Sequence, residues 1–197
     1  ASSESISSTF PASATAKHRT YRVQVTANDG LFDSPVGAAE VTIVNSDPIL
    51  SGPTLSAPTA VVGDVLTCAA TATDADPEDA PTIEYSWSDG STGPTYTVTI
   101  ADAVDSVIAC MATADDADGG TATGTASATV TNTGPTVDAV SVSPEIGRVG
   151  DTLTCSATAT DADGEIPTVV YAWSTGAAGT EYTITESDNP GDTITCT

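Results

Sequence analysis

The stretch that decides the fold is residues 62–76, VGDVLTCAATATDAD, which recurs almost unchanged as VGDTLTCSATATDAD at residues 149–163. In both copies apolar or small residues alternate with mostly hydroxyl-bearing ones, so that Leu66, Cys68 and Ala70 share one face. A period of two residues is typical of a β-strand with one buried face. The stretch therefore predicts a repeated, half-buried strand that runs into an Asp-Ala-Asp loop.

The repeat continues on both sides of this stretch and divides the chain. Its offset is 87 residues at the start and 86 residues after the loop, where one residue is lost. An Asn-x-x-Pro linker precedes each copy, at residues 45–48 and 132–135, and proline cannot extend a helix or donate to a sheet ladder. We therefore predict a complete domain at 47–133, a domain lacking its last strand at 134–197, and the C-terminal half of a domain at 1–46.

The same alternation marks the other segments of the repeat, separated by Gly, Pro, Asp and Ser clusters. Threonine fills most of the outward positions, as suits a β-branched residue, and no apolar stripe of helical period lasts beyond one turn. The expected inward residues of one segment are Tyr96, Val98 and Ile100. The fold class predicted is all-β.

Two cysteines flank a tryptophan in each copy of the repeat. Cys68, Trp87 and Cys110 form one trio, and the second consists of Cys155, Trp173 and Cys196. The trio resembles that of immunoglobulin-like domains, in which an inter-sheet disulfide packs on a tryptophan. The Tyr-x-Trp-x-x-Gly of residues 85–90 is similar to PKD-like repeats, and the array as a whole is similar to bacterial Ig-like and cadherin-like repeats.

The resemblance implies tandem immunoglobulin-like β-sandwiches joined by short proline-containing linkers, with disulfides Cys68–Cys110 and Cys155–Cys196. Each bridge would close a loop of more than 40 residues, for which chain entropy alone predicts about 4 kcal/mol of stabilisation. Such bridges favour an extracellular or cell-surface location. A zinc site is the rival interpretation of the cysteines, but the chain has no Cys-x-x-Cys pair and its one histidine is remote from them.

Charge excludes several classes of function. The chain has 27 acidic residues against 4 basic ones, a net charge of −23, and one histidine, His18. Phosphate backbones and anionic lipids would be repelled, so we expect no nucleic-acid partner and no membrane insertion. With a single histidine, the chain offers little basis for histidine-based acid–base catalysis. We therefore expect no enzymatic activity.

Many of the acids are bunched in the predicted loops, although like charges side by side are unfavourable without a cation. Carboxylates without imidazole or thiolate suit a hard cation, best Ca²⁺. By the immunoglobulin-like resemblance, the two acidic loops of a domain lie at one end, beside the preceding linker. The alternative is that Asp and Gly form ordinary metal-free turns. The candidate ligands are Asp74, Asp76, Glu78, Asp79, Asp115, Asp116, Asp118, Asp161, Asp163, Glu165, Asn45 and Asp47, with Asn132 as a further candidate beside Asp161.

These patterns predict an extracellular structural repeat module, such as a stalk, spacer or filament subunit of a microbial surface protein, stiffened by disulfides and junctional calcium. The alternative is an adhesin or carbohydrate-recognition module of a secreted multidomain protein, with a glycan or surface ligand. The partners expected are neighbouring repeats or identical chains. The half-domains at the two ends fit either a window on a longer array or strand exchange between copies that builds a filament.

Overall fold

The computed structural model describes residues 9–197, which form twelve β-strands and one short 3₁₀ turn. The first eight residues of the predicted half-domain at 1–46 lie outside the described residues. In chain order the elements are η1 (Ala12–Ala14), β1 (Thr20–Val25), β2 (Gly37–Thr42), β3 (Ile49–Leu55), β4 (Thr59–Ala60), β5 (Val65–Thr73), β6 (Thr82–Trp87), β7 (Thr95–Thr97), β8 (Val107–Asp115), β9 (Thr121–Val130), β10 (Thr136–Ser143), β11 (Thr152–Thr160) and β12 (Glu181–Thr183). The all-β prediction is confirmed.

The chain divides into two compact units. The first consists of residues 9–56 together with Thr67–Tyr96 and Ala109–Ser127. The second consists of Ala57–Leu66, Thr97–Ile108 and Ala128–Thr197. Each acidic loop lies, with the linker beside it, inside a single unit.

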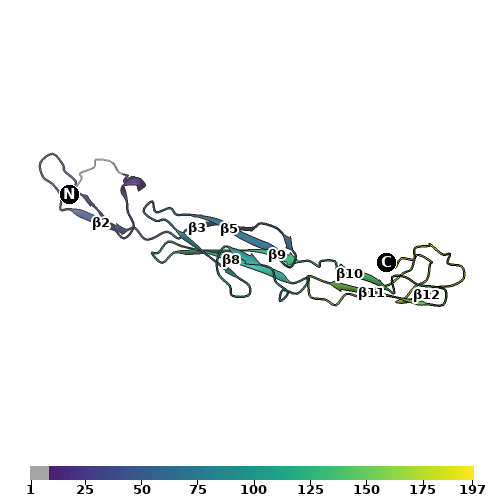
Figure 1. Ribbon diagram of the computed structural model, residues 1–197. Coiled ribbons are helices and arrows are strands. Elements are labelled where there is room, and N and C mark those ends of the chain that lie inside the picture. Colours follow the sequence, from purple (N-terminus) through teal and green to yellow (C-terminus); the bar gives the residue numbers. More distant parts are fainter. Residues whose placement is uncertain (1–8) are drawn as a thin grey trace. The chain divides into compact units, whose positions relative to one another are not determined.

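Four sheets organise the strands (Figure 1). The hairpin β1–β2 forms one sheet, and β10-β11-β12 forms another. Between them along the chain, β3-β5-β7 and β4-β9-β8-β6 make up the middle sandwich. Strand β5 alternates as its sequence predicts, with buried Leu66 and Cys68 between exposed neighbours.

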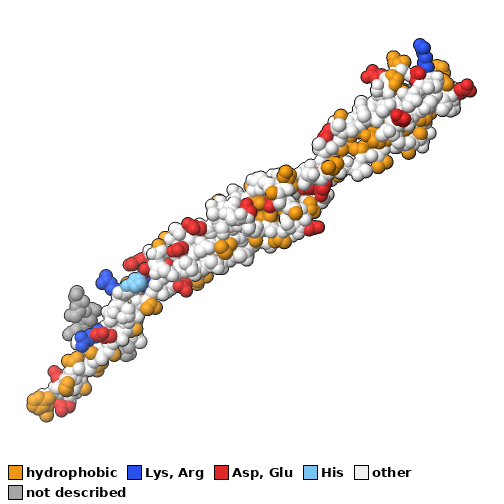
Figure 2. Space-filling view, turned by 90° about the horizontal axis from the view of Figure 1, so that it is seen from below, with side chains coloured by type: hydrophobic (Ala, Val, Ile, Leu, Met, Phe, Trp, Pro, Cys, Tyr) orange, Lys and Arg blue, Asp and Glu red, His pale blue; other side chains and the backbone are white. Residues whose placement is uncertain are grey.

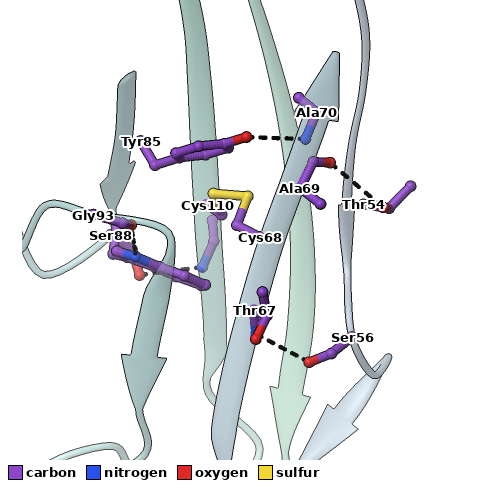
Figure 3. The surroundings of a disulfide bond; sticks show 12 residues. Thr54, Ser56, Thr67, Cys68, Ala69, Ala70, Tyr85, Ser88, Gly93 and Cys110 are labelled. Atoms are coloured by element: carbon purple, nitrogen blue, oxygen red, sulfur yellow. Dashed lines mark hydrogen bonds between the residues drawn. A yellow bond between two sulfur atoms is a disulfide. The ribbon is translucent and has the colours of Figure 1, made fainter. Parts of the chain in front are cut away.

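A disulfide ties the two sheets of the middle sandwich together. Cys68 on β5 and Cys110 on β8 form this bridge, and both are almost fully buried. Trp87 pairs with Cys110 in the β6–β8 ladder and donates its indole N–H to the carbonyl of Gly93 at 2.9 Å. Figure 3 shows Tyr85 beside the bridge, where its hydroxyl accepts the backbone N–H of Ala70 at 3.0 Å. The sequence trio is thus one packed unit at the centre of the sandwich.

The second repeat rebuilds this arrangement. Cys155 on β11 is bridged to Cys196, and Trp173 forms a β-bridge with Cys196. The indole N–H of Trp173 donates to the carbonyl of Gly179, again at 2.9 Å. Its buried core is small, consisting of Leu153, Cys155, Trp173 and Ile184. Both predicted disulfides are therefore present, and they indicate folding in an oxidising compartment.

One expected core position is wrong. Val98 is buried as the alternation requires, but Ile100 is 71 % exposed. Strand β7 ends at Thr97, and the backbone N–H of Asp102 donates to the carbonyl of Thr99 at 3.0 Å. That turn breaks the period of two, so that Ile100 no longer shares the inward face.

Figure 2 shows one face of the surface by its side-chain colours. Most of the face seen in Figure 2 is white, the colour of Ser, Thr, Gly and backbone atoms, with acidic side chains interspersed. Within residues 9–197, no helix has the length and apolar character needed to cross a bilayer.

Candidate metal centre

The first acidic loop, residues 74–79, begins where β5 ends. The chain turns there because the Asp74 carboxylate accepts the backbone N–H of Asp76 at 2.7 Å. Carboxylate oxygens of Asp74, Asp76 and Asp79 all lie within 4.8 Å of one another, and the three residues are half-buried. Three like charges at this spacing repel one another unless a cation offsets them. An all-oxygen donor set of this kind is chemically suited to Ca²⁺.

The linker at 45–48 is bound to this loop. The backbone N–H of Ser46 donates to Asp76 Oδ2 at 2.8 Å. A charge-assisted hydrogen bond from a backbone amide is among the stronger protein hydrogen bonds. The loop therefore holds the segment that connects the β1–β2 hairpin to the middle sandwich.

The second acidic loop, residues 115–120, follows β8 and is organised around Asp116. This carboxylate is 6 % exposed, and its Oδ1 accepts the backbone N–H groups of Asp118 and Gly120. The Asn45 amide donates to Asp116 Oδ2 at 2.7 Å, and this bond is the main reason that the pKa of Asp116 lies below its usual range. Asn45 thus connects the linker to the second loop.

Gly120 permits the close approach of loop and linker. A Cβ atom at this position would lie 2.3 Å from Asp116 Oδ2 and 3.0 Å from the Cα atom of Asp47. Real Cβ atoms do not approach backbone and carboxylate atoms so closely, because the packing has no free volume to take them. Only glycine fits here without displacing the linker.

A lysine lies between the two loops. Lys17 Nζ is 2.5 Å from both carboxylate oxygens of Asp79 and 2.7 Å from Asp118 Oδ2. It also donates to Asn45 Oδ1 at 3.3 Å, while His18 Nε2 lies 2.6 Å from Asp118 Oδ2. We call the linker 45–48 with its two acidic loops the first joint.

The third acidic loop, residues 161–165, is the counterpart of the first loop in the second repeat. Asp161 accepts the backbone N–H of Asp163 at 2.8 Å, which reproduces the turn made by Asp74 and Asp76. Carboxylate oxygens of Asp161, Asp163 and Glu165 lie within 4.8 Å of one another. Desolvation, then the charges of Asp161 and Asp163, raise the pKa of Glu165. Like charges are thus already raising the free energy of the ionised loop.

The linker contact is also repeated. Thr133, the counterpart of Ser46, donates its backbone N–H and its hydroxyl to Asp163 Oδ2 at 2.5 and 2.6 Å. We call the linker 132–135 with the third acidic loop the second joint. No ion pair within residues 9–197 reaches the carboxylates of this joint.

One buried oxygen in each cluster has no hydrogen-bond partner among the described residues. These atoms are Asp74 Oδ2 in the first loop and Asp163 Oδ1 in the third loop. A buried carboxylate oxygen without a donor is unfavourable, and native structures usually provide it with a donor or an ion. The donor chemistry and these two oxygens both fit a hard cation.

Not all the candidate ligands come together. Asp74, Asp76 and Asp79 form one cluster, and Asp161, Asp163 and Glu165 form the other. Asp116 and Asp118 belong to the first joint through Asn45 and Lys17, and Asp47 lies against Gly120. Glu78 and Asp115 lie outside both carboxylate clusters, and Asp115 accepts the backbone N–H of Ala117. The side-chain amide of Asn132 donates to the carbonyl of Thr133.

Sequence reasoning missed Lys17, His18 and Gly120. Lys17 is the single lysine of a chain with 27 acids, which is a signal in itself, but its partners are 62 and 101 residues away. Gly120 stands in an ordinary-looking Asp-Gly-Gly turn sequence. Its role depends on how closely the linker passes.

No family model matches this chain, and no curated protein matches it significantly.

Proposed function

We propose that this chain is an extracellular structural repeat module, built of tandem immunoglobulin-like sandwiches and acting as a stalk, spacer or filament subunit of a microbial surface protein. The observation that carries the proposal is the repeated linker contact. In both repeats the residue two positions before the linker proline donates its backbone N–H to the second aspartate of the Asp-Ala-Asp loop. Such a contact restricts the segment that connects successive repeats, which is what a stiff array needs.

Each repeat is also stabilised in a way that suits such a module. Its core is poor in large apolar side chains, so burial contributes comparatively little. The disulfide offsets this weakness by restricting the unfolded chain. A disulfide-bonded sandwich that exposes many small polar residues is suited to a mechanical role.

Calcium is the second part of the proposal. Asp161, Asp163 and Glu165 would hold one ion. Asp74, Asp76 and Asp79 offer a second set of oxygen ligands, in which Lys17 already pairs with Asp79. The bound ion would neutralise the clustered carboxylates and stiffen the linker that the same aspartates hold. Affinity in the range of roughly 10⁻⁴–10⁻³ M would suffice outside a cell.

The alternative is a recognition module, an adhesin or a glycan-binding domain. Sugar-binding sites commonly use exposed aromatic faces, but Trp87 and Trp173 are 4 % and 3 % exposed and pack in the cores. Neither tryptophan therefore offers such a face, and the exposed aromatic side chains of residues 9–197 are Phe10 and Phe32.

Calorimetric titration of chelator-treated protein with CaCl₂ tests the calcium proposal, together with small-angle scattering and thermal melting in calcium and in EDTA. We expect saturable heat, a higher melting temperature and a narrower distribution of particle lengths. Asp163→Asn should remove most of the binding at the second joint, whereas the matched control Glu145→Gln, an exposed carboxylate outside the loop, should bind as wild type. Absence of heat with unchanged melting and scattering would overturn the calcium proposal.

A further inference from the structure

The Lys17 side chain is unusually enclosed for a surface lysine of so acidic a chain. It is 13 % exposed, and the Asp79 side chain that it meets is 8 % exposed. Its ammonium has oxygen partners on Asp79, Asp118 and Asn45. Ion pairs sheltered from water are screened far less by salt than those on open surfaces.

These partners belong to different parts of the fold. Lys17 precedes β1 and Asn45 follows β2, so both flank the hairpin. Asp79 lies in the loop after β5, and Asp118 lies in the loop after β8. Since β5 and β8 belong to different sheets of the middle sandwich, one ammonium connects the hairpin segment to loops from both sheets.

Asn45 completes the connection. Its carbonyl oxygen accepts from Lys17 at 3.3 Å, while its amide nitrogen donates to Asp116 at 2.7 Å. His18 adds a second contact to Asp118, but its side chain is 60 % exposed. The enclosed positive charge at this joint is therefore that of Lys17.

The segment before the second joint lacks this group. The backbone N–H of His18 donates to the carbonyl of Ile43 at 2.8 Å. At the equivalent position, the backbone N–H of Asp105 donates to the carbonyl of Val130 at 2.9 Å. His18 and Asp105 both have positive φ, 57° and 65°, which supports their equivalence. The residue before each is Lys17 in one case and Val104 in the other.

We propose that Lys17 is a tethered cation: its ammonium latches the β1–β2 segment onto the first and second acidic loops, so that the first joint closes without a metal ion. The second joint, with Val104 in the corresponding place, has no such group. The ion pairs of Lys17 are sufficient support for the latch. Only the comparison between the two joints depends on the calcium proposal. The two joints therefore differ in their need for a free cation.

The test compares wild type with Lys17→Met in EDTA, so that failure of calcium binding cannot affect it. Methionine keeps the aliphatic stem and removes the charge. We expect backbone amide exchange of Ser46 and His18, and of the Asn45 side-chain amide, to rise by about tenfold or more, as local opening becomes easier. The amides of β8 and the Thr133 amide of the second joint should keep their wild-type protection.

Arg22→Met is the matched control, because Arg22 pairs with Glu40 on the exposed surface of the hairpin, at 3.6 Å. It removes the same charge from the same segment and should leave the Ser46 and His18 amides unchanged. Wild-type protection of these amides in Lys17→Met would overturn the latch. An equal loss of protection throughout β5 and β8 would also overturn it, because the role of Lys17 would then be general stability.

Discussion

The two joints make the same backbone contact but differ in whether their carboxylates are paired with a basic side chain. In each, an Asp-Ala-Asp turn receives the linker amide, through Ser46 and Asp76 in the first joint and Thr133 and Asp163 in the second. The first joint contains Lys17 among its carboxylates, and the second joint has no ion pair within the described residues. The two joints share the backbone contact but differ in the charged groups around it. The backbone geometry of a joint and the pairing of its charges are thus separate properties.

The largest effect should come from a feature that both repeats share. Replacing Cys68 and Cys110 together by alanine should lower the free energy of unfolding by about 4 kcal/mol, and replacing Cys155 and Cys196 should cost about the same, by loop-closure entropy. The sequence separations, 42 and 41 residues, are nearly equal. Denaturant unfolding followed by circular dichroism measures both losses. Clearly unequal losses would show that the smaller buried core of the second repeat, not chain entropy, decides the outcome.

The next largest effect should come from a difference in packing between the two joints. Gly120→Ala places a methyl group against Asp116 and the backbone of Asp47, and we expect a loss of roughly 1–3 kcal/mol as in other overpacked sites. Gly134, in the second linker, has no neighbouring atom within 4 Å of the place that a Cβ atom would take. Gly134→Ala is therefore the control and should be nearly neutral in thermal melting. Equal effects of the two substitutions would contradict close packing at the first joint.

A smaller effect should follow from introducing a lysine at the position before the second joint that corresponds to Lys17. Val104→Lys places an ammonium before the second joint, at the position that corresponds to Lys17 before the first joint. We expect several-fold weaker calcium binding at the second joint, since a tethered charge competes with the free ion, and slower exchange of the Thr133 amide in EDTA. Val104→Met controls for the longer side chain. Unchanged calcium affinity in Val104→Lys would mean that the two positions are not electrostatically equivalent.

The smallest effect concerns pH in the second repeat. Hydrogen bonds from the Thr185 backbone, the Tyr182 hydroxyl and the Thr185 hydroxyl hold the pKa of Asp188 below its usual value. A carboxylate with a depressed folded-state pKa stabilises the fold above its unfolded pKa, about 3.9. That contribution is lost as pH falls through the folded-state pKa. Asp188→Asn should flatten the dependence of unfolding midpoint on pH below about 4; an unchanged slope would contradict this.

Local signals made much of the fold predictable. The period of two in residues 62–76 identified β5 and its buried face, and the Cys-Trp-Cys trio located the buried core of each repeat. These features depend on neighbours along one strand or on residue types with few alternatives. The prediction that Ile100 is buried was wrong, because a turn beginning at Thr99 interrupts the strand that the alternation predicted.

The candidate sites were predictable only in part. The Asp-Ala-Asp turns are local, and Asp74 with Asp76, like Asp161 with Asp163, lie in clusters that the sequence indicated. Glu78 lies outside the first cluster although it stands in the same acidic run, and the run that begins at Asp115 contributes no residue to either cluster. A run of acids does not specify which carboxylates converge, because that depends on where each side chain points after the loop has turned.

By itself, then, the sequence determined the strands, the repeat, the cysteine–tryptophan cores and the acidic character of the loops, all of which follow from residue type and short-range spacing. Only the tertiary structure decided that Lys17 meets Asp79 and Asp118, and that Gly120 makes room for Asp47. The physical reason is that ion pairing and close packing act between atoms brought together across tens of residues. Their partners are chosen by how linker and loops meet in space, which no local pattern encodes.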